Sequence, residues 1–502
     1  MNALQAYKDL MSRSREIAHL DSAMELAYWD QRTNIPARGH AHRVRHLAAM
    51  AKMRYRRLTD PRIGDLLSTV EDSSLIDDRF GVVSVNVREV RRVYDRLKRV
   101  PAKLATDIVR AGAEAEAAWE KACPKNDWPR LRPFMERLAA MKREEAELLG
   151  YENEPYDALL GEYEPEETAR SIEALLGPLS AALVRLLERI DYGRSNRMTA
   201  PTTTRVSVPD QEHFATEVAR KLGYRLESGR IDISSHPFAT GLGPGDVRIT
   251  SRYNETDLRE GLFGVVHEVG HALYVQGLPT EHWGEPICHV ASLSIDESQS
   301  LIWEFFVARS NGFWNHLLPD LMAAFPHLKA LSHEDVVRWI NQVNPASLRV
   351  NADEVTYNLH IVLRFELERD LINRVLEVKD LPAAWIEKSH KYLGHRPTDH
   401  RGGVMQDVHW PSGLFGYFPG YTLGHVYAAQ FFHRAKEELG DLDEQFSRGE
   451  FSHLRGWLRH RIHSAGATFR PHDLIRRVTG EGINPLILVE YLETKYEGLY
   501  GV

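Results

Sequence analysis

The chain has 502 residues, 43% hydrophobic and 27% charged, as expected for a soluble globular enzyme with a large core. Its formal net charge of −8 argues against a nucleic-acid-binding protein, which would normally carry a basic face. With two cysteines, no segment resembling a signal peptide and no apolar run of membrane-spanning length, we expect a cytoplasmic protein without disulfides or a membrane partner.

Helical periodicity dominates the first 190 residues. Apolar positions between Val44 and Leu58 recur every three or four residues after Pro36, and similar spacings continue along this part of the chain. Residues 195–209 contain two prolines and three consecutive threonines, which indicates a loop, and Asp210 is predicted to cap the next helix. We expect a single domain over residues 1–502, with a helical half over about 1–200 and a second half over about 201–502.

A strand region is predicted between Ile231 and Tyr253. Residues 241–245, Gly-Leu-Gly-Pro-Gly, predict a turn, and residues 246–250 alternate polar and apolar as a half-buried strand does. A small sheet at this place would lie beside the helix that follows. Its edge could bind an extended peptide, although a purely structural hairpin fits the same pattern.

The motif His267-Glu268-Val269-Gly270-His271 lies within an apolar run, Leu262–Leu278, that has helical spacing. Histidines four residues apart project from one face of a helix and can bind one zinc ion. Glu268 can reach a metal-bound water from the same side and act as a general base. The alternative is a polar helix face with solvated or buried histidines, but buried imidazoles need a partner.

A catalytic zinc site usually has three protein ligands. Gly277 occupies the position at which metzincins carry their third histidine, so that class is excluded. Glu297 opens an apolar helical run and is the leading candidate for the third ligand. Glu304 and His289 are weaker candidates for the same role.

Two further elements are predicted toward the C-terminus. Asn351 and Glu354 have the spacing of a capping box, which predicts a long helix that ends near Val375. Residues 402–424 are rich in glycine, proline and aromatic residues, and they include Pro411 and Pro419. This composition predicts a loop over the whole segment.

Several short motifs occur in one order along almost the whole chain. They are Trp29-Asp30 with Pro36, His236-Pro237-Phe238, Asp246 to Thr250, His267 to His271, Glu297 to Ser300, Arg349 with Ala352-Asp353-Glu354, Gln406 to Trp410, and Gly416 to Pro419. In these motifs the chain resembles the carboxypeptidase Taq family of metallocarboxypeptidases. An ordered series of motifs is much harder to obtain by chance than any one of them.

The resemblance implies a mainly α fold: a saddle-shaped helical peptidase with a deep active-site cleft and a small β-sheet beside the metal helix, assembled as a homodimer. The implied activity is removal of C-terminal residues from peptides, with broad side-chain tolerance. His267, His271 and Glu297 would bind one divalent metal per chain, and Glu268 would serve as the base. The ligand set suits Zn²⁺, but Co²⁺ or Mn²⁺ can occupy such sites.

An exopeptidase of this kind must recognise a free α-carboxylate, for which a guanidinium fork is well suited. Arg349 matches the arginine of the family's motif and is the candidate; the alternative is a structural arginine beside a helix cap. A tyrosine or an imidazole can stabilise a developing oxyanion, and the candidates for this task are His409, Tyr417 and Tyr421. His236 and Arg248 are candidates for shaping the cleft, although Asp246 is placed to pair with Arg248 structurally.

The chain departs from the family's pattern around Glu297. Asp296 stands where the family usually has histidine, Ser294 where it has glycine, and Leu301 where it has arginine. We expect these changes to affect substrate preference and turnover more than metal binding, because Asp296 adds negative charge beside the site.

Two other functions fit parts of the same pattern. One is an endopeptidase or dipeptidyl-carboxypeptidase with a similar helical cleft. The other is a catalytically silent helical binding protein that has kept a structural metal. Glu268 argues against the second, because a structural metal site needs no base.

Overall fold

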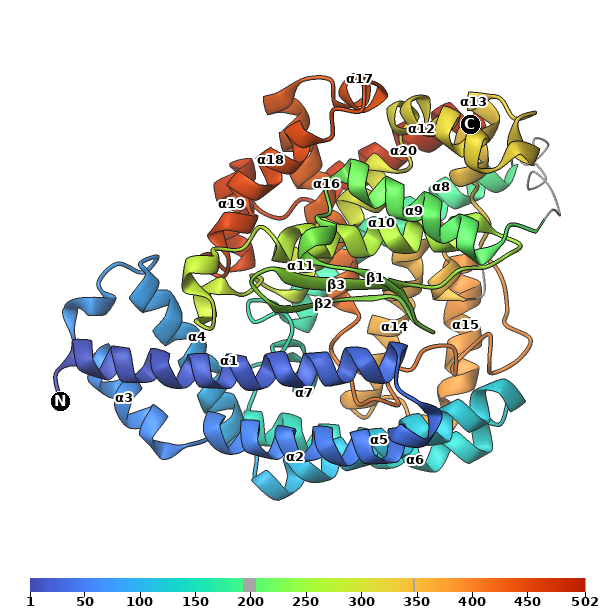
Figure 1. Ribbon diagram of the computed structural model, residues 1–502. Coiled ribbons are helices and arrows are strands. Elements are labelled where there is room, and N and C mark those ends of the chain that lie inside the picture. Colours follow the sequence, from blue (N-terminus) through green and yellow to red (C-terminus); the bar gives the residue numbers. More distant parts are fainter. Residues whose placement is uncertain (193–204, 346–347, 502) are drawn as a thin grey trace. The chain divides into compact units, whose positions relative to one another are not determined.

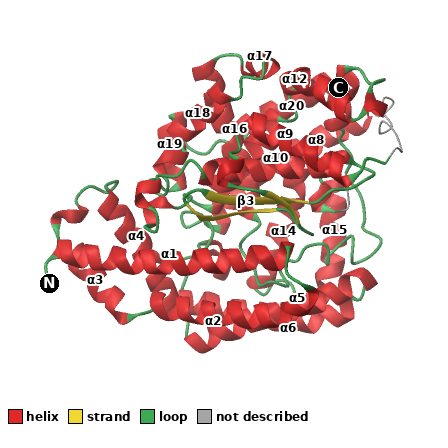
Figure 2. Ribbon diagram, viewed as in Figure 1, coloured by secondary structure: helices red, strands yellow, loops and turns green. Residues whose placement is uncertain are grey.

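A computed structural model describes residues 1–192, 205–345 and 348–501 (Figure 1). Helices make up most of the described residues, and one small sheet is formed near the middle of the chain (Figure 2). The expected mainly α class with a small sheet is therefore confirmed. Within the described ranges, no helix combines the length and apolarity required to cross a bilayer.

The chain packs into two compact units, and each unit is assembled from segments that are far apart in the sequence. The first unit comprises residues 1–98, 199–340 and 431–482, and the second comprises residues 99–198, 341–430 and 483–502. Each unit therefore draws on both of the halves expected from the sequence.

The first unit contains the sheet and the motif helix. Its main elements are α1 (Ala3–Thr33), α2 (His40–Leu58), α3 (Pro61–Glu71), α4 (Val82–Arg99), α9 (Val208–Leu222), β1 (Ile231–Ile233), β2 (Phe238–Gly243), β3 (Asp246–Ser251), α10 (Leu258–Val275), α11 (Leu293–Leu301), α12 (Asn311–Ala324), α13 (His333–Ile340), α17 (Leu442–Ser447), α18 (Ser452–Arg461) and α19 (Pro471–Thr479).

The described residues of the second unit form helices and loops, without a strand. Its main elements are α5 (Ala102–Ala122), α6 (Trp128–Leu149), α7 (Pro155–Leu160), α8 (Ala169–Tyr192), α14 (Glu354–Ile372), α15 (Leu381–Leu393), α20 (Leu486–Tyr500) and the first part, to Gln430, of α16 (Pro419–Leu439).

The sheet has the strand order β1-β3-β2, with β3 parallel to β1 and antiparallel to β2. The alternation expected over Asp246–Thr250 holds from Asp246 to Ile249, where Val247 and Ile249 are buried and Arg248 is half-buried, but it fails at Thr250, which is fully buried. Helix α10 packs against β2 and β3, which places the sheet directly beside the metal-motif helix (Figure 1).

The turn between β2 and β3 is shorter than predicted. Residues 241–243 belong to β2, so only Pro244 and Gly245 separate the two strands. Helix α1 holds this edge strand: the Ser22 hydroxyl donates to the Leu242 carbonyl, and Thr240 donates to Glu25 over 2.9 Å. These tertiary contacts extend a Gly-rich segment that local sequence rules assign to a turn.

Two predicted helix starts are wrong by a few residues. Helix α9 begins at Val208 and is capped by Ser207, which accepts a hydrogen bond from the Asp210 backbone N–H, so Asp210 lies in the first turn and is not the cap. Pro209 fits that turn because its missing N–H is not needed there. Residues 195–204 of the predicted loop lie outside the described residues.

Helix α14 is capped by Asp353, whereas Asn351 lies in a preceding 3₁₀ turn. The Asp353 carboxylate accepts hydrogen bonds from the backbone N–H groups of Val355 and Thr356. The predicted loop over residues 402–424 ends at Phe418, because Pro419 is tolerated as the first residue of α16. Tyr417 is therefore in the loop, whereas Tyr421 is in the helix.

The position of the α14 cap can be tested by a pair of substitutions. Asp353→Ala should lower the free energy of unfolding by about 1–2 kcal/mol, because it removes the acceptor for the first N–H groups of the helix. Asn351→Ala should change it little, since Asn351 is exposed and makes no such bond to α14. Chemical denaturation of both variants measures the difference, and a larger loss for Asn351→Ala would contradict the assignment.

Candidate metal centre and substrate-contact residues

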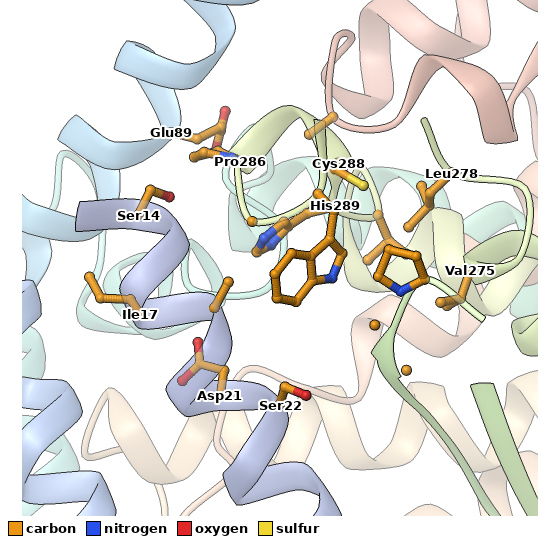
Figure 3. Close-up of a pocket in the computed structure, with 18 of the residues that line it drawn as sticks. Ser14, Ile17, Asp21, Ser22, Glu89, Val275, Leu278, Pro286, Cys288 and His289 are labelled. Carbon is orange, nitrogen blue, oxygen red and sulfur yellow. The ribbon is translucent and has the colours of Figure 1, made fainter. Parts of the chain in front are cut away.

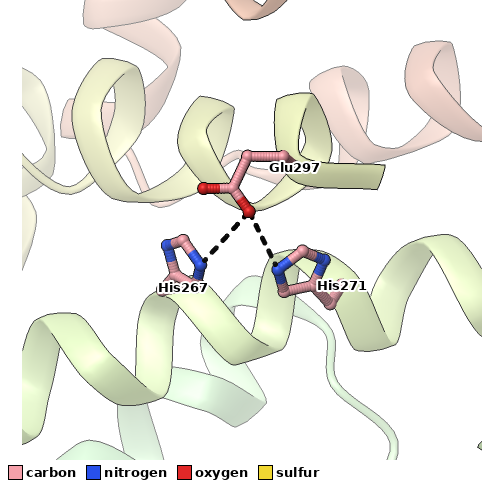
Figure 4. Close-up of side chains that lie close together, drawn as sticks. All are labelled: His267, His271 and Glu297. Carbon is pink, nitrogen blue, oxygen red and sulfur yellow. Dashed lines mark ion pairs between the residues drawn. The ribbon is translucent and has the colours of Figure 1, made fainter. Parts of the chain in front are cut away.

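Helix α10 presents His267 and His271 from successive turns, and Glu297 of α11 lies opposite them (Figure 4). The Glu297 Oε2 atom is 3.8 Å from Nε2 of His267 and 3.6 Å from Nε2 of His271. Two ligands that each lie about 2.1 Å from a tetrahedral ion are separated by about 3.4 Å. The separations of these atoms are therefore close to those that one bound cation requires.

The three ligand atoms lie within 4.8 Å of one another. In the described part of the chain, no other group of histidine, cysteine and carboxylate side chains converges in this way. Of the three candidates considered for the third ligand, the structure therefore brings Glu297 to the histidine pair.

Gly270 allows α10 and α11 to approach closely enough for this convergence. A Cβ atom at Gly270 would lie 2.4 Å from the Ser300 Cα and 2.6 Å from the Gln299 carbonyl oxygen. Any side chain would push the helices apart, because the obstructing atoms belong to the backbone. A glycine inside a helix costs about 1 kcal/mol, so its presence in the motif is explained by this contact.

Two carboxylates hold the outer ring nitrogens of the histidines. Glu304 Oε2 lies 2.9 Å from Nδ1 of His267, and Asp296 Oδ1 lies 3.0 Å from Nδ1 of His271. The Glu304 contact is a hydrogen bond that orients the His267 ring, as carboxylates do around many histidine-ligated metals, whereas the Asp296 contact with His271 is an ion-pair distance without hydrogen-bond geometry. Glu304, a weaker candidate for metal ligation, thus contacts the far side of a ligand ring.

Glu304 reaches His267 from a π-helical turn, Ile302–Val307, that directly follows α11. Such turns are rare and are found most often at functional sites. Arg309 pairs with the second oxygen of Glu304 at 3.2 Å. The sequence carries no local signal for the π-helical turn, so the contact between Glu304 and the outer nitrogen of His267 could not be predicted from residue spacing.

Negative charge dominates this centre. Burial lowers the pKa of His267, but Glu297 and Glu304 raise it by more, to about 10. Burial also raises the pKa of the Glu268 carboxyl, while the two histidines lower it. A buried cluster with this excess of carboxylates is stabilised by a cation, and the donor set of two imidazoles and one carboxylate fits a divalent metal.

A cavity of about 490 Å³ lies beyond the C-terminal end of α10, between α1, α4 and the segment that leads to α11 (Figure 3). His289 lines this cavity, and it therefore does not belong to the metal cluster. Two acidic residues of the lining are paired with arginines, Asp21 with Arg54 at 2.5 Å and Glu89 with Arg92 at 2.9 Å, and a third, Glu25, accepts a hydrogen bond from Thr240.

The other two candidates in the first unit lie near the sheet. The predicted pairing of Arg248 with Asp246 is confirmed, with N–O distances of 2.8 Å, and the Arg248 guanidinium also lies over the Trp29 ring at 4.3 Å. His236 is exposed between β1 and β2, and its Nδ1 lies 2.9 Å from the Pro237 carbonyl oxygen. Arg248 is thus held mainly by structural contacts.

The second unit brings the remaining four candidates into one cluster. His409 Nε2 lies 3.2 Å from the Tyr421 hydroxyl, and the ring of His409 lies 5.4 Å from that of Tyr417. The Arg349 guanidinium is 5.1 Å from the centroid of the Tyr421 ring. Residues predicted from separate motifs therefore form one polar and aromatic surface within this unit.

Arg349 is buried and bound by Asp407, whose Oδ1 accepts hydrogen bonds from Nε at 3.0 Å and Nη2 at 2.9 Å. The other oxygen of Asp407 accepts from Arg364, a fully buried residue of α14. Burial alone would raise the pKa of Asp407, but the two arginines hold it far below its usual range. Arg364 is not among the residues predicted from the sequence motifs, although an arginine within an apolar helix is a recognisable signal.

The helical fold and the buried histidine–carboxylate centre define a metal-dependent hydrolase. Residues 9–496 match the sequence profile of the carboxypeptidase Taq (M32) metallopeptidase family, and the chain belongs to this family. It is accordingly a metallocarboxypeptidase, a metal-dependent peptide hydrolase.

Relatives cover the chain almost from end to end. It is 48% identical to thermostable carboxypeptidase 1 of Thermus thermophilus, over 99% of both chains, and 35% identical to carboxypeptidase 1 of Bacillus subtilis, over 98% of both. Among solved structures, it resembles the M32 carboxypeptidase of Deinococcus radiodurans with a TM-score of 0.95 at 34% identity, covering 99% of this chain and 100% of that one.

Metal binding should release protons. With a pKa of about 10, His267 of the metal-free protein is protonated at pH 7.5, but only the neutral imidazole can bind a metal. Metal affinity should therefore fall as the pH is lowered through the neutral range. Calorimetric titration with Zn²⁺ at pH 7.5, in buffers of different ionisation enthalpy, should show at least one proton released per ion.

Glu304→Gln is the matched control for this measurement. It removes one of the carboxylates that raise the pKa of His267, so fewer protons should be released. Binding without any proton release by the unsubstituted protein would show that His267 is already neutral.

Proposed function

We propose that this chain removes single amino acids from the C-termini of peptides, with His267, His271 and Glu297 as metal ligands. The observation that carries the proposal is the convergence of the two Nε2 atoms and Glu297 Oε2 beside the buried carboxyl of Glu268. A divalent cation held there would supply Lewis acidity, which acidifies a bound water and polarises the scissile carbonyl. Zn²⁺ is the proposed ion, because two imidazoles and a carboxylate suit it; Co²⁺ or Mn²⁺ can bind the same donors.

Glu268 is proposed as the general base. It follows His267 on α10, it is 6% exposed, and it interacts electrostatically with both histidines. A carboxylate in this position can take a proton from the attacking water and return it to the leaving amine. Burial raises its pKa, which makes it a better proton acceptor than an exposed glutamate.

Arg349 is proposed to bind the α-carboxylate of the peptide. Its Nε and one of its Nη atoms contact Asp407, and Nη1 takes no part in these hydrogen bonds. Asp407 thus fixes the plane of the guanidinium while a donor group remains for a substrate. His409, Tyr417 and Tyr421, which cluster beside it, are proposed to stabilise the oxyanion.

The oligomeric state and the cellular location of the protein are also proposed. The homodimer is proposed on the family resemblance, and sedimentation of the purified protein would test it. A cytoplasmic location is proposed because the two cysteines, Cys123 and Cys288, are free thiols.

Glu268→Gln should lower kcat by roughly 10²–10⁴-fold, because it removes the base while keeping the shape of the side chain. Metal content, measured by elemental analysis, should be unchanged. With an N-terminally blocked peptide, mass spectrometry should show that the wild-type enzyme removes one residue at a time from the C-terminus. Internal fragments or dipeptide products would instead support the endopeptidase or dipeptidyl-carboxypeptidase, and an inactive wild type would support the silent binding protein.

Arg349→Lys should lower kcat/KM for peptides by roughly 10–100-fold, because lysine keeps the charge but loses the planar fork. A C-terminally amidated peptide is the matched control: the wild type should strongly prefer the free acid, and the variant much less so. If the variant keeps the wild-type preference, Arg349 does not read the carboxylate.

A further inference from the structure

Glu368 is a fully buried carboxyl group of α14 in the second unit. Its Oε1 accepts a hydrogen bond from Trp410 Nε1, and its Oε2 accepts from the Tyr156 hydroxyl at 2.8 Å and the Gly416 backbone N–H at 3.1 Å. Placing an ionisable group in the core is costly, and none of the roles proposed above uses it.

Two of these donors, Trp410 and Gly416, lie at the two ends of one loop, residues 410–416. Trp410 follows His409 in the chain, and Gly416 precedes Tyr417. Glu368 thus joins the two ends of the segment 410–416 at positions adjacent to two of the proposed oxyanion-stabilising residues. The rings of His409 and Tyr417 lie 5.4 Å apart across this junction.

The junction leaves little freedom for alternative arrangements. Gly416 has φ +86°, and a Cβ atom there would lie 2.7 Å from the Leu160 backbone nitrogen. The Trp410 ring stacks on Phe415 with an interplanar angle of 8° and meets Trp385 edge to face. The loop therefore packs closely, and Glu368 accepts hydrogen bonds from two groups at the ends of the loop.

These contacts require that both side-chain oxygens at position 368 accept hydrogen bonds. The groups that donate hydrogen bonds to Glu368 are the Tyr156 hydroxyl and the N–H groups of Trp410 and Gly416, and the positive charge of Arg364 also favours the ionised carboxylate. A glutamine would direct its NH₂ group at one of these donors, so it could not satisfy all of them. The pKa of Glu368 is raised to about 7, because burial outweighs the lowering by the three donors and Arg364.

We propose that Glu368 is a positioning residue for peptide hydrolysis: it closes the 410–416 loop and thereby holds His409 and Tyr417 in their working geometry. This inference rests on the proposed function of the His409, Tyr417 and Tyr421 cluster. Glu368 acts through the loop and does not itself contact the substrate.

The test is steady-state kinetics of the metal-loaded Glu368→Gln enzyme on a blocked peptide. Because the loop residues are proposed to act on the oxyanion, kcat should fall at least 10-fold while KM stays within about twofold. Glu366→Gln is the matched control: it lies on the same helix, but its carboxylate pairs with Lys388 and Tyr392, so kcat should be unchanged. Wild-type kcat in Glu368→Gln would overturn the proposal.

A second pair of variants tests the positioning role of Glu368 if Glu368→Gln does not fold. Tyr156→Phe removes the donor that lies outside the loop, so it should lower stability and leave kcat within about twofold. Trp410→Phe removes a donor of the loop itself and should lower kcat at least 10-fold. Equal kcat in the two variants would overturn the proposal, since Glu368 would then only stabilise the core.

His409→Ala and Tyr417→Phe separate this inference from the function on which it rests. If both variants keep wild-type kcat, the proposed oxyanion role fails, and the positioning role fails with it. If they lose activity while Glu368→Gln does not, only the role of Glu368 is overturned.

Discussion

The close contact between α10 and α11 is the constraint on which the metal centre depends. Neither helix can form the site alone, because α10 supplies two imidazoles and α11 supplies the carboxylate. The glycine at position 270 allows the backbones to touch, and the ligand atoms then meet within 4.8 Å. A small residue is thus as necessary to the geometry as the ligands themselves.

Electrostatics then determines what such a centre can hold. Glu268, Asp296, Glu297 and Glu304 all lie around two histidines, and nearby carboxylates raise the pKa of both imidazoles. A divalent cation bound there would take the place of protons on the imidazoles, which would link metal binding to pH. Asp296 lies 3.0 Å from His271 Nδ1 and contributes to the raised pKa of that imidazole.

In the second unit, the residue proposed to bind the α-carboxylate of the peptide, Arg349, is a buried arginine whose charge needs a partner in the core. Two guanidinium groups share one carboxylate, Asp407, so that neither cation is left without a partner in the core. The aromatic loop beside them is closed by another buried acid, Glu368. In both cases a carboxylate that is not itself proposed to contact the peptide fixes the orientation of residues that are. Catalytic geometry requires rigid support of this kind.

Local patterns in the sequence were sufficient for the helical class, the strand alternation of β3 as far as Ile249 and the two histidines on one helix face, because these depend on near neighbours in the chain. The helix starts at Ser207 and Asp353 were misplaced by a few residues, since several side chains competed to cap the same turn. Only the tertiary structure could choose Glu297 over Glu304 and His289, because that choice depends on how two helices cross and on a π-helical turn. The partnership of Arg349, Arg364 and Asp407 likewise joins residues up to 58 positions apart, a separation over which sequence spacing carries no geometric information.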